Sequence, residues 1–187
     1  MNTEIENKTR NLGLIHIYTG AGKGKTTAAI GLAARALGSG LSVCYCSFHK
    51  DPEKYGYSEM ESLRKLGAFV FNFAKHHPHM EENVTEDTIA SITEEVTQAL
   101  DTLKELQANI HFDLLIMDEI LISIRDKYLH EDELIDFIKN KPVNTELVLT
   151  GIDVTERTLE LADYITNMEC VKHPYYDNIP SRKGIEY

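Results

Sequence analysis

Residues 18–27 read Tyr18-Thr19-Gly20-Ala21-Gly22-Lys23-Gly24-Lys25-Thr26-Thr27, and this run lies between an apolar segment and a helix-forming one. A glycine-rich loop in that position is typical of a phosphate-binding loop. Its glycines allow a tight turn in which several backbone N–H groups point inward, and the positive end of the following helix stabilises an anion. We therefore expect residues 20–27 to bind the polyphosphate of a nucleotide such as ATP. The alternative is an ordinary glycine-rich turn before a surface helix.

Two side chains of this loop carry the expected chemistry. Lys25 is predicted to contact the terminal phosphates as a point charge, and the Thr26 hydroxyl is predicted to ligate a Mg²⁺ ion that bridges phosphate oxygens. The usual pattern has a glycine, four residues and then Gly-Lys-Ser/Thr, which is met at Gly24, Lys25 and Thr26. Its first glycine, however, is replaced by Thr19. The loop entry is therefore built differently, and the nucleotide need not lie as it does in an ordinary ATPase.

Composition indicates an ordinary globular chain of 187 residues, 42% apolar and 26% charged. We expect one domain over residues 1–187, with a flexible N-terminal segment at 1–10 and a C-terminal tail at 171–187. The net charge of −11 argues against a nucleic-acid partner, because neutralising a phosphate backbone takes a clustered basic face. No apolar run approaches the roughly 20 residues that span a bilayer, and the polar start lacks the core of a signal peptide. A cytoplasmic protein without membrane contact is expected.

The three cysteines do not suggest a disulfide framework. Cys44 and Cys46 alternate within an apolar run, so on a strand both thiols point to the same face. Because no second pair of ligands lies nearby, a buried structural role is expected for them rather than half of a metal site.

Hydrophobic periodicity predicts alternating strands and helices. Apolar residues recur every three or four positions from Thr85 to about Gln107, which indicates a long helix with one buried stripe. Ser58 and Glu61 have the spacing of a capping box. The alternation predicts an α/β fold with a mostly parallel sheet, helices on both faces and the ligand at the carboxyl ends of the strands. Loops are expected at 1–10, 49–57, 74–83 and 171–187. The predicted strands are 12–18, 41–48, 68–73, 112–117, 146–149 and 164–168, and the predicted helices are 26–37, 58–66, 85–107, 133–139 and 155–162.

A second informative feature is the run Leu114-Leu115-Ile116-Met117-Asp118-Glu119, an apolar strand that ends in two carboxylates. Beside a phosphate loop, such carboxylates can hold Mg²⁺ directly or through water and complete what Thr26 begins. Adjacent residues of an extended chain point to opposite sides, so one carboxylate is expected to meet the metal. The other is expected to orient the surrounding ligands or to cap a helix. Which of Asp118 and Glu119 contacts the metal stays open, and an acidic pair without such a loop would more often be a helix cap.

Several motifs taken together resemble one family. Residues 19–35, which continue from the loop into Ala28-Ala29-Ile30-Gly31-Leu32-Ala33-Ala34-Arg35, are similar to the start of the CobA-type ATP:corrinoid adenosyltransferases. The resemblance runs through nearly the whole chain, and the ordered set is more specific than the loop alone. It continues at Met117-Asp118-Glu119, Leu149-Thr150-Gly151, Leu161-Ala162-Asp163, Val171-Lys172-His173-Pro174 and Lys183-Gly184-Ile185-Glu186-Tyr187.

The resemblance implies a P-loop NTPase-like (RecA-like) fold and an enzyme that transfers the 5′-deoxyadenosyl group of ATP to Co(I) of a reduced corrinoid such as cob(I)alamin. Triphosphate leaves and adenosylcobalamin forms. Co(I) is a strong nucleophile, so the reaction needs in-line positioning and neutralisation of the departing charge rather than a protein base. Lys25, Lys23, the loop amides and Mg²⁺ at Thr26 and Glu119 can provide these. The resemblance also implies an electron donor such as a flavoprotein and a homodimer.

On the corrinoid side, family members are thought to remove the lower axial ligand of cobalt by pressing apolar or aromatic side chains beneath the ring. The corresponding region here reads Phe71-Asn72-Phe73-Ala74-Lys75-His76-His77-Pro78-His79-Met80, with His77 and His79 where the family usually places aromatic residues. A histidine bonded to cobalt would oppose reduction, so neither is assigned as a ligand. Phe73, His77, His79 and Tyr175 are candidate corrinoid contacts. Core packing is the default for Phe73, and Tyr175 is as well suited to anchor the C-terminus.

Two other classes of protein stay open at this stage. A P-loop phosphotransferase or ATPase would release ADP or phosphate instead of triphosphate. A non-catalytic corrinoid carrier or sensor would bind both ligands without forming a carbon–cobalt bond.

Overall fold

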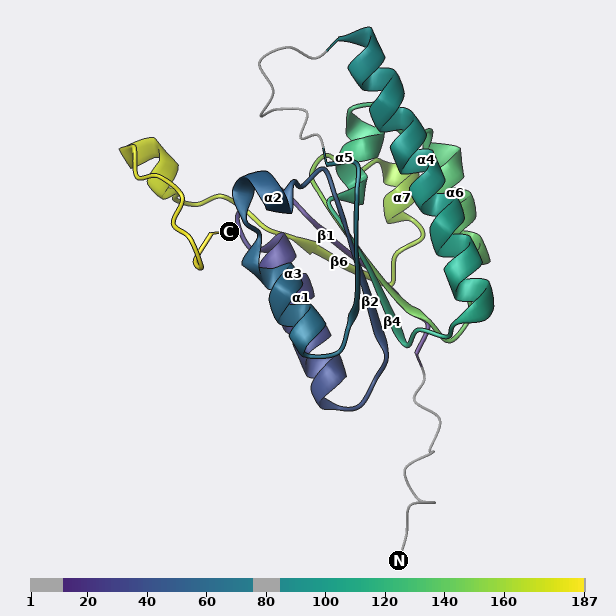
Figure 1. The fold of residues 1–187 in the computed structure, drawn as a ribbon. Coiled ribbons are helices and arrows are strands. Elements are labelled where there is room, and N and C mark those ends of the chain that lie inside the picture. The colour runs from purple at the N-terminus through teal and green to yellow at the C-terminus, as the bar shows by residue number, and fades with distance from the viewer. Residues whose placement is uncertain (1–11, 76–84, 187) are drawn as a thin grey trace, which may run out of the picture.

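A six-stranded sheet forms the centre of the computed structural model, which describes residues 12–75 and 85–186. The strand order is β3-β2-β4-β5-β1-β6, and all neighbouring strands are parallel (Figure 1). The predicted mostly parallel sheet is therefore confirmed. The strands are β1 (Ile15–Thr19), β2 (Val43–Phe48), β3 (Phe69–Phe73), β4 (Leu114–Asp118), β5 (Glu146–Thr150) and β6 (Tyr164–Asn167).

Helices cover both faces of the sheet, as the alternating pattern predicts (Figure 1). Helices α1 and α3 pack on one face, where small residues such as Ala29 and Ala33 let α1 lie close to the strands. The opposite face is covered by α4, α5 and α6, with α7 beside them. The helices are α1 (Lys25–Gly38), α2 (Pro52–Tyr55), α3 (Ser58–Lys65), α4 (Glu86–Asn109), α5 (Ile120–Arg125), α6 (Glu131–Asn140) and α7 (Glu156–Leu159), with a 3₁₀ turn η1 (Pro174–Asp177) in the tail.

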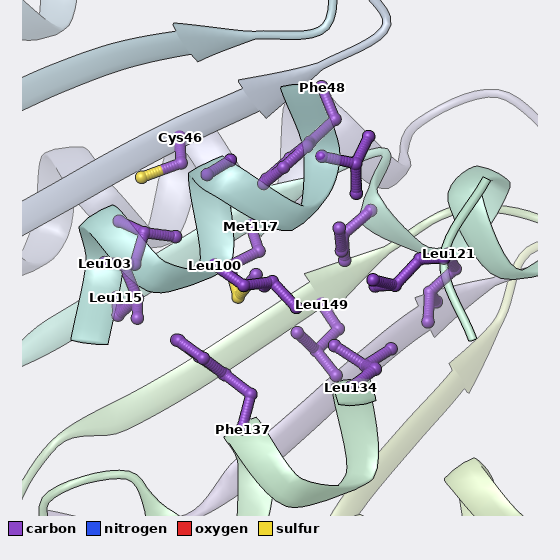
Figure 2. Packing of buried hydrophobic residues seen from close by; sticks show 14 of the residues in the cluster. Cys46, Phe48, Leu100, Leu103, Leu115, Met117, Leu121, Leu134, Phe137 and Leu149 are labelled. Atoms are coloured by element: carbon purple, nitrogen blue, oxygen red, sulfur yellow. The ribbon is translucent and has the colours of Figure 1, made fainter. Parts of the chain in front are cut away.

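The larger hydrophobic core lies between the sheet and the helices α4, α5 and α6. Figure 2 shows Met117 and Leu149 of the sheet among Leu100 of α4 and Phe137 of α6. The stripe predicted along the long helix is confirmed, because its central residues are buried. Cys44 and Cys46 are buried as well, with their sulfur atoms 3.7 Å apart, as a structural role requires. The buried residues of α4 are Ile92, Val96, Ala99, Leu100 and Leu103.

The strand order places the phosphate loop and the acidic strand one strand apart. β5 pairs with β1 on one side and with β4 on the other, so that Leu149 lies opposite both Ile17 and Met117. The carboxyl ends of all three strands therefore meet at one edge of the sheet. The loop after β1 and the carboxylates after β4 are brought together at this edge, with Thr150 of β5 between them.

The structure adds a helix, α5, that the sequence analysis does not predict. It begins at Ile120, directly after Glu119, and contains Ile120, Leu121 and Ile122, which are all buried. A short helix that opens with consecutive apolar residues has no period that separates it from a strand. Its first turn is placed by Glu119, whose backbone adopts a left-handed conformation with φ 65°.

Other predictions were wrong in detail. The capping box is absent, because Ser58 is the first helical residue of α3 and Tyr57 occupies the N-cap without a side-chain hydrogen bond. The helix predicted over 155–162 ends at Leu159, because the chain must turn so that Asp163 can bond to Ile15 at the start of β1. The segment 49–57, expected to be a loop, contains α2, which Asp51 caps through two backbone N–H groups.

Some predictions fall on residues that the structure does not describe. They concern the N-terminal segment 1–10 and the histidines His76, His77 and His79. Within residues 12–75 and 85–186, none of the helices combines the length and the apolar character that crossing a bilayer takes.

Candidate functional site

The phosphate loop connects β1 to α1 and lies against the chain that leaves β6. Gly22 donates its backbone N–H to the carbonyl of Met168 at 2.6 Å. A Cβ atom on Gly22 would lie 2.5 Å from the carbonyl oxygen of Glu169, a distance that real Cβ contacts do not show. Gly20 and Gly24 have φ values of 96° and 121°, which side chains other than hydrogen rarely allow. The glycines are therefore required by the close approach of the β6 exit as well as by the turn.

Lys25 is the first residue of α1, and its side chain turns back over the loop. Its ammonium donates to the carbonyl oxygens of Gly20 at 2.7 Å and Gly22 at 2.9 Å. Burial lowers the pKa of Lys25, while the neighbouring Glu119 and Asp118 act in the opposite direction. The ammonium is thus held against the backbone of the loop.

Asp118 is fully buried at the end of β4 and accepts hydrogen bonds on both oxygens. Its Oδ1 accepts from Thr26 at 3.0 Å and from Thr150 at 2.7 Å. Its Oδ2 accepts from the hydroxyl of Tyr45 at 2.9 Å and from the ammonium of Lys50 at 2.6 Å. Burial raises the pKa of Asp118, but the charge and hydrogen bond of Lys50, together with the hydrogen bonds from Thr150 and Tyr45, lower it overall. A carboxylate has about four lone-pair positions, and these four partners occupy them.

Glu119 points elsewhere, because the backbone leaves the strand at this residue. Its N–H donates to the hydroxyl of Thr150 at 2.8 Å, and its left-handed conformation turns the side chain into a cleft beside Thr26. The expectation that the two carboxylates point apart is met, although through this turn and not through an extended chain. Burial and the charge of Asp118 raise the pKa of Glu119.

The cleft has a volume of about 490 Å³ and is open to solvent. Its walls come from the start of α1, the start of α3, the end of β4 and the C-terminal tail. The tail residues were expected to lie outside any regular element, and here they close one side of the cleft. The lining residues are Thr26, Thr27, Ile30, Lys50, Tyr57, Ser58, Glu59, Ser62, Glu119, Gly184, Ile185 and Glu186.

Lys50 is a residue of this site that the sequence analysis missed. It lies in the segment after β2 that was expected to be a loop, yet its side chain is only 9% exposed. One signal could have found it. Residues just beyond the carboxyl ends of parallel strands surround the ligand site in open α/β sheets, and Lys50 follows β2 by two residues.

The described corrinoid candidates lie apart from the cleft. Phe73 packs against Phe48 and Phe71, with ring centroids 5.6 and 6.1 Å away, in agreement with its default role in the core. Tyr175 is 75% exposed in η1 and contacts the ring of Tyr176. Neither residue lines the 490 Å³ cleft. His77 and His79 lie outside the described residues.

The donors at the site suit Mg²⁺ that arrives with phosphate. In the part of the chain that the structure describes, no group of three or more His, Cys, Asp or Glu side chains could hold a metal alone. Thr26 and Glu119 both face the cleft, and the Thr26 hydroxyl is bonded to Asp118. Mg²⁺ is usually held by one or two carboxylates together with substrate phosphates, which matches this set of oxygen donors.

Replacing Glu119 by glutamine is expected to increase the free energy of unfolding near neutral pH, because the folded protein disfavours the charged carboxylate. A raised carboxyl pKa contributes stability below the unfolded value of about 4.3, and this contribution is lost as the pH rises through the folded pKa. The gain in the variant should therefore be absent in acid and reach on the order of 1 kcal/mol at neutral pH. Urea unfolding across this pH range measures it.

Glu105→Gln, on the exposed side of α4, is the matched control and should change the free energy of unfolding little at any pH. A Glu119→Gln variant that is less stable than the natural protein at neutral pH would contradict the assignment. It would mean that Lys25 and Lys50 stabilise the carboxylate more than burial disfavours it.

Comparisons with known proteins find similarity along nearly the whole chain. A family profile described as "ATP:corrinoid adenosyltransferase BtuR/CobO/CobP" matches residues 11–187. A protein of Sinorhizobium named corrinoid adenosyltransferase is 33% identical over 96% of this chain and 83% of its own length. The corrinoid adenosyltransferase of Escherichia coli K12 is 31% identical over 94% of this chain and 86% of its own length.

A relative from Salmonella typhimurium, named corrinoid adenosyltransferase CobA, is 30% identical over 94% of this chain and 86% of its own length. Among solved structures, the flagellar accessory protein FlaH from Methanocaldococcus jannaschii superposes with a TM-score of 0.54 at 18% identity. The superposition covers 83% of this chain and 70% of FlaH. At that identity the likeness concerns the fold alone, and it agrees with a P-loop NTPase-like α/β architecture.

Proposed function

This chain belongs to the ATP:corrinoid adenosyltransferase family, and we propose that it transfers the 5′-deoxyadenosyl group of ATP to the Co(I) of a reduced corrinoid such as cob(I)alamin, releasing triphosphate. The observation that carries the proposal is the link between the loop and the acidic strand. The Thr26 hydroxyl donates to Asp118 while Thr26 and Glu119 line one cleft. The groups proposed to bind phosphate and metal therefore lie close together, which supports the proposal.

The reaction is a displacement at a saturated carbon. The electron pair of Co(I) forms the bond to C5′ of the ribose, and the pair of the C5′–O bond leaves with the triphosphate. No proton is transferred, so no general base is needed. The protein has two tasks, which are to hold C5′ in line with cobalt and to neutralise the charge that develops on the leaving oxygen.

The loop performs the second task, neutralisation of the charge on the leaving oxygen. Its backbone N–H groups, Lys23 and Lys25 surround the triphosphate with positive charge. Thr26 and Glu119 would hold Mg²⁺, with Asp118 behind them, and the ion would supply further charge neutralisation. Thr19, which replaces the usual first glycine of the motif, belongs to the part of the site that differs from an ATPase. The loop therefore holds the triphosphate as a leaving group and need not direct water at the last phosphate.

The remaining partners follow from the same chemistry. Co(I) is formed by one-electron reduction of Co(II), so we propose an electron donor such as a reduced flavoprotein. Phe73, His77, His79 and Tyr175 stay candidates for contact with the corrinoid. Assembly as a homodimer and a cytoplasmic location are proposed from the resemblance to the family.

Anaerobic incubation with ATP, Mg²⁺ and chemically reduced cobalamin tests the proposal. The expected products are a light-sensitive alkylated cobalamin and inorganic triphosphate in equal amounts. Release of ADP or phosphate without alkylation would overturn the proposal in favour of a phosphotransferase or ATPase. Binding of both ligands without a carbon–cobalt bond would instead indicate a carrier or sensor.

A further inference from the structure

Lys50 is a buried cation that has no role in the reaction as proposed above. Its ammonium lies 2.6 Å from Oδ2 of Asp118, and its side chain lines the same cleft as Thr26 and Glu119. Burial opposes the charged form, but the charge and hydrogen bond of Asp118 raise the pKa of Lys50 above its ordinary value. The side chain therefore stays charged at neutral pH.

Several contacts hold this ammonium in place, and one of them is with the phosphate loop. Besides Asp118, it lies 3.3 Å from the hydroxyl of Thr26 and 3.5 Å from a carboxylate oxygen of Glu59. It also lies 5.1 Å from the centre of the Tyr57 ring. Thr26, Tyr57 and Glu59 line the same cleft as Lys50, and the buried carboxylate of Asp118 lies behind its wall.

The backbone of Lys50 is fixed independently of its side chain. The side-chain amide of Asn72 donates to the carbonyl oxygen of Lys50 at 2.8 Å and to the hydroxyl of Ser47 at 2.8 Å. This ties the end of β2 to β3. A lysine with a fixed backbone and a long, flexible stem can move its ammonium between neighbouring acceptors while its Cα stays in place.

We propose that Lys50 is a second polyphosphate-binding cation, held by Asp118 at the edge of the cleft and passed to a phosphate oxygen when the triphosphate of ATP binds. This assignment rests on the proposed function, because it takes the ligand of the cleft to be a triphosphate. The Lys25 ammonium contacts the carbonyl oxygens of Gly20 and Gly22, whereas the Lys50 ammonium contacts the hydroxyl of Thr26. Two ammonium groups at different parts of the site suit a ligand with several charged phosphates better than one with a single phosphate.

The proposed transfer of Lys50 from Asp118 to a phosphate oxygen also explains why this lysine is paired with a buried carboxylate. A buried ion pair is on average no more stabilising than an apolar pair of the same size, so stability alone gives little reason for one at this place. Asp118 neutralises Lys50 while its ammonium lies 3.3 Å from the hydroxyl of Thr26, in the first turn of α1. Phosphate oxygens compete with Asp118 for the same ammonium.

A double-mutant cycle measures this competition. Inorganic tripolyphosphate is titrated by calorimetry, with EDTA present so that no metal takes part, into the natural protein, Lys50→Met, Asp118→Asn and the double variant. Asp118→Asn frees the ammonium and should tighten binding about tenfold. Adding Lys50→Met to Asp118→Asn should then weaken binding about tenfold or more. Equal affinity of the double variant and Asp118→Asn would overturn the proposal and make Lys50 only a counterion.

Lys50→Met alone leaves the Asp118 carboxylate buried without its cation and is the variant at risk of not folding. The double variant removes both charges of the pair, so it is better able to fold. Lys50→Gln, which keeps a donor toward Asp118, gives a second test. It should weaken binding of tripolyphosphate more than binding of AMP, and equal losses for both would overturn the proposal. Lys65→Met is the matched control, since Lys65 lies on α3 and pairs with Glu61 in solvent. It should change either affinity less than twofold.

These measurements separate the two proposals, because binding of tripolyphosphate does not require adenosyl transfer. A protein that shows the expected cycle but forms no alkylated cobalamin would retain the role of Lys50 and lose the proposed function. A protein that transfers the adenosyl group while the cycle shows no effect of Lys50 would retain the function and lose this role.

Discussion

Lys25→Ala is expected to lower the rate of adenosyl transfer about a hundredfold. The Lys25 ammonium sits against the carbonyl oxygens of Gly20 and Gly22, inside the loop that would hold the leaving triphosphate. Removing one preorganised charged contact to a developing anion costs on the order of 3 kcal/mol in the barrier. Single-turnover formation of alkylated cobalamin from pre-reduced Co(I) measures this step without the reduction that precedes it.

Lys65→Ala serves as the control for the loss of a positive charge, because Lys65 is exposed and pairs with Glu61 at 3.5 Å on the surface of α3. Its transfer rate should stay within twofold of the natural protein. Thermal melts of both variants show whether the loop is still folded. A folded Lys25→Ala variant with full activity would refute the role assigned to the loop.

Gly20→Ala is expected to have the largest effect on the fold around the site. A Cβ atom there would lie 2.4 Å from the side-chain oxygen of Asn167 and 2.5 Å from the carbonyl oxygen of Met168. Gly20 also has a φ of 96°, which costs other residues on the order of 1–3 kcal/mol. Strain and overlap together should reduce the free energy of unfolding by about 3 kcal/mol. Nucleotide affinity should fall at least tenfold, because the loop must move away from the β6 exit.

Gly31→Ala is the matched control for this substitution. Gly31 lies within α1, and a Cβ atom there would have no neighbour within 4 Å. Alanine favours a helix over glycine by about 1 kcal/mol, so this variant should be more stable than the natural protein. Urea unfolding and calorimetric ATP titration of both variants give the comparison. Equal stability of the two variants would contradict the steric requirement at Gly20.

Much of the fold could be predicted because its signals are local. The apolar stripe of α4 is visible as a repeat within one segment, and the glycines before Lys25 mark a turn wherever the chain goes afterwards. Both features depend on residues that are neighbours in sequence. The alternation of strands and helices then restricts the sheet to a parallel arrangement, because parallel strands need crossover connections.

The shape of the candidate site was harder to predict from the sequence, for a specific reason. Glu119 was expected to continue an extended chain, yet its left-handed conformation turns it into the cleft at the start of α5. Residues 120–123 of that helix are all buried, so it has no amphipathic pattern to reveal it. The tail residues Gly184 to Glu186 line the cleft from more than 60 positions away in sequence, and no local pattern indicates where a tail packs.

The sequence by itself determined the phosphate loop, the acidic end of β4, the parallel α/β class and the family resemblance, since each depends on residue types at fixed spacing. Only the tertiary structure decided that Asp118 binds Lys50, Tyr45 and Thr150 as well as Thr26. The physical reason is the strand order. β2 and β5 flank β4, so Tyr45 of β2, Lys50 just beyond β2 and Thr150 of β5 meet at the carboxylate of Asp118. Spacing along the chain carries no record of which strands become neighbours.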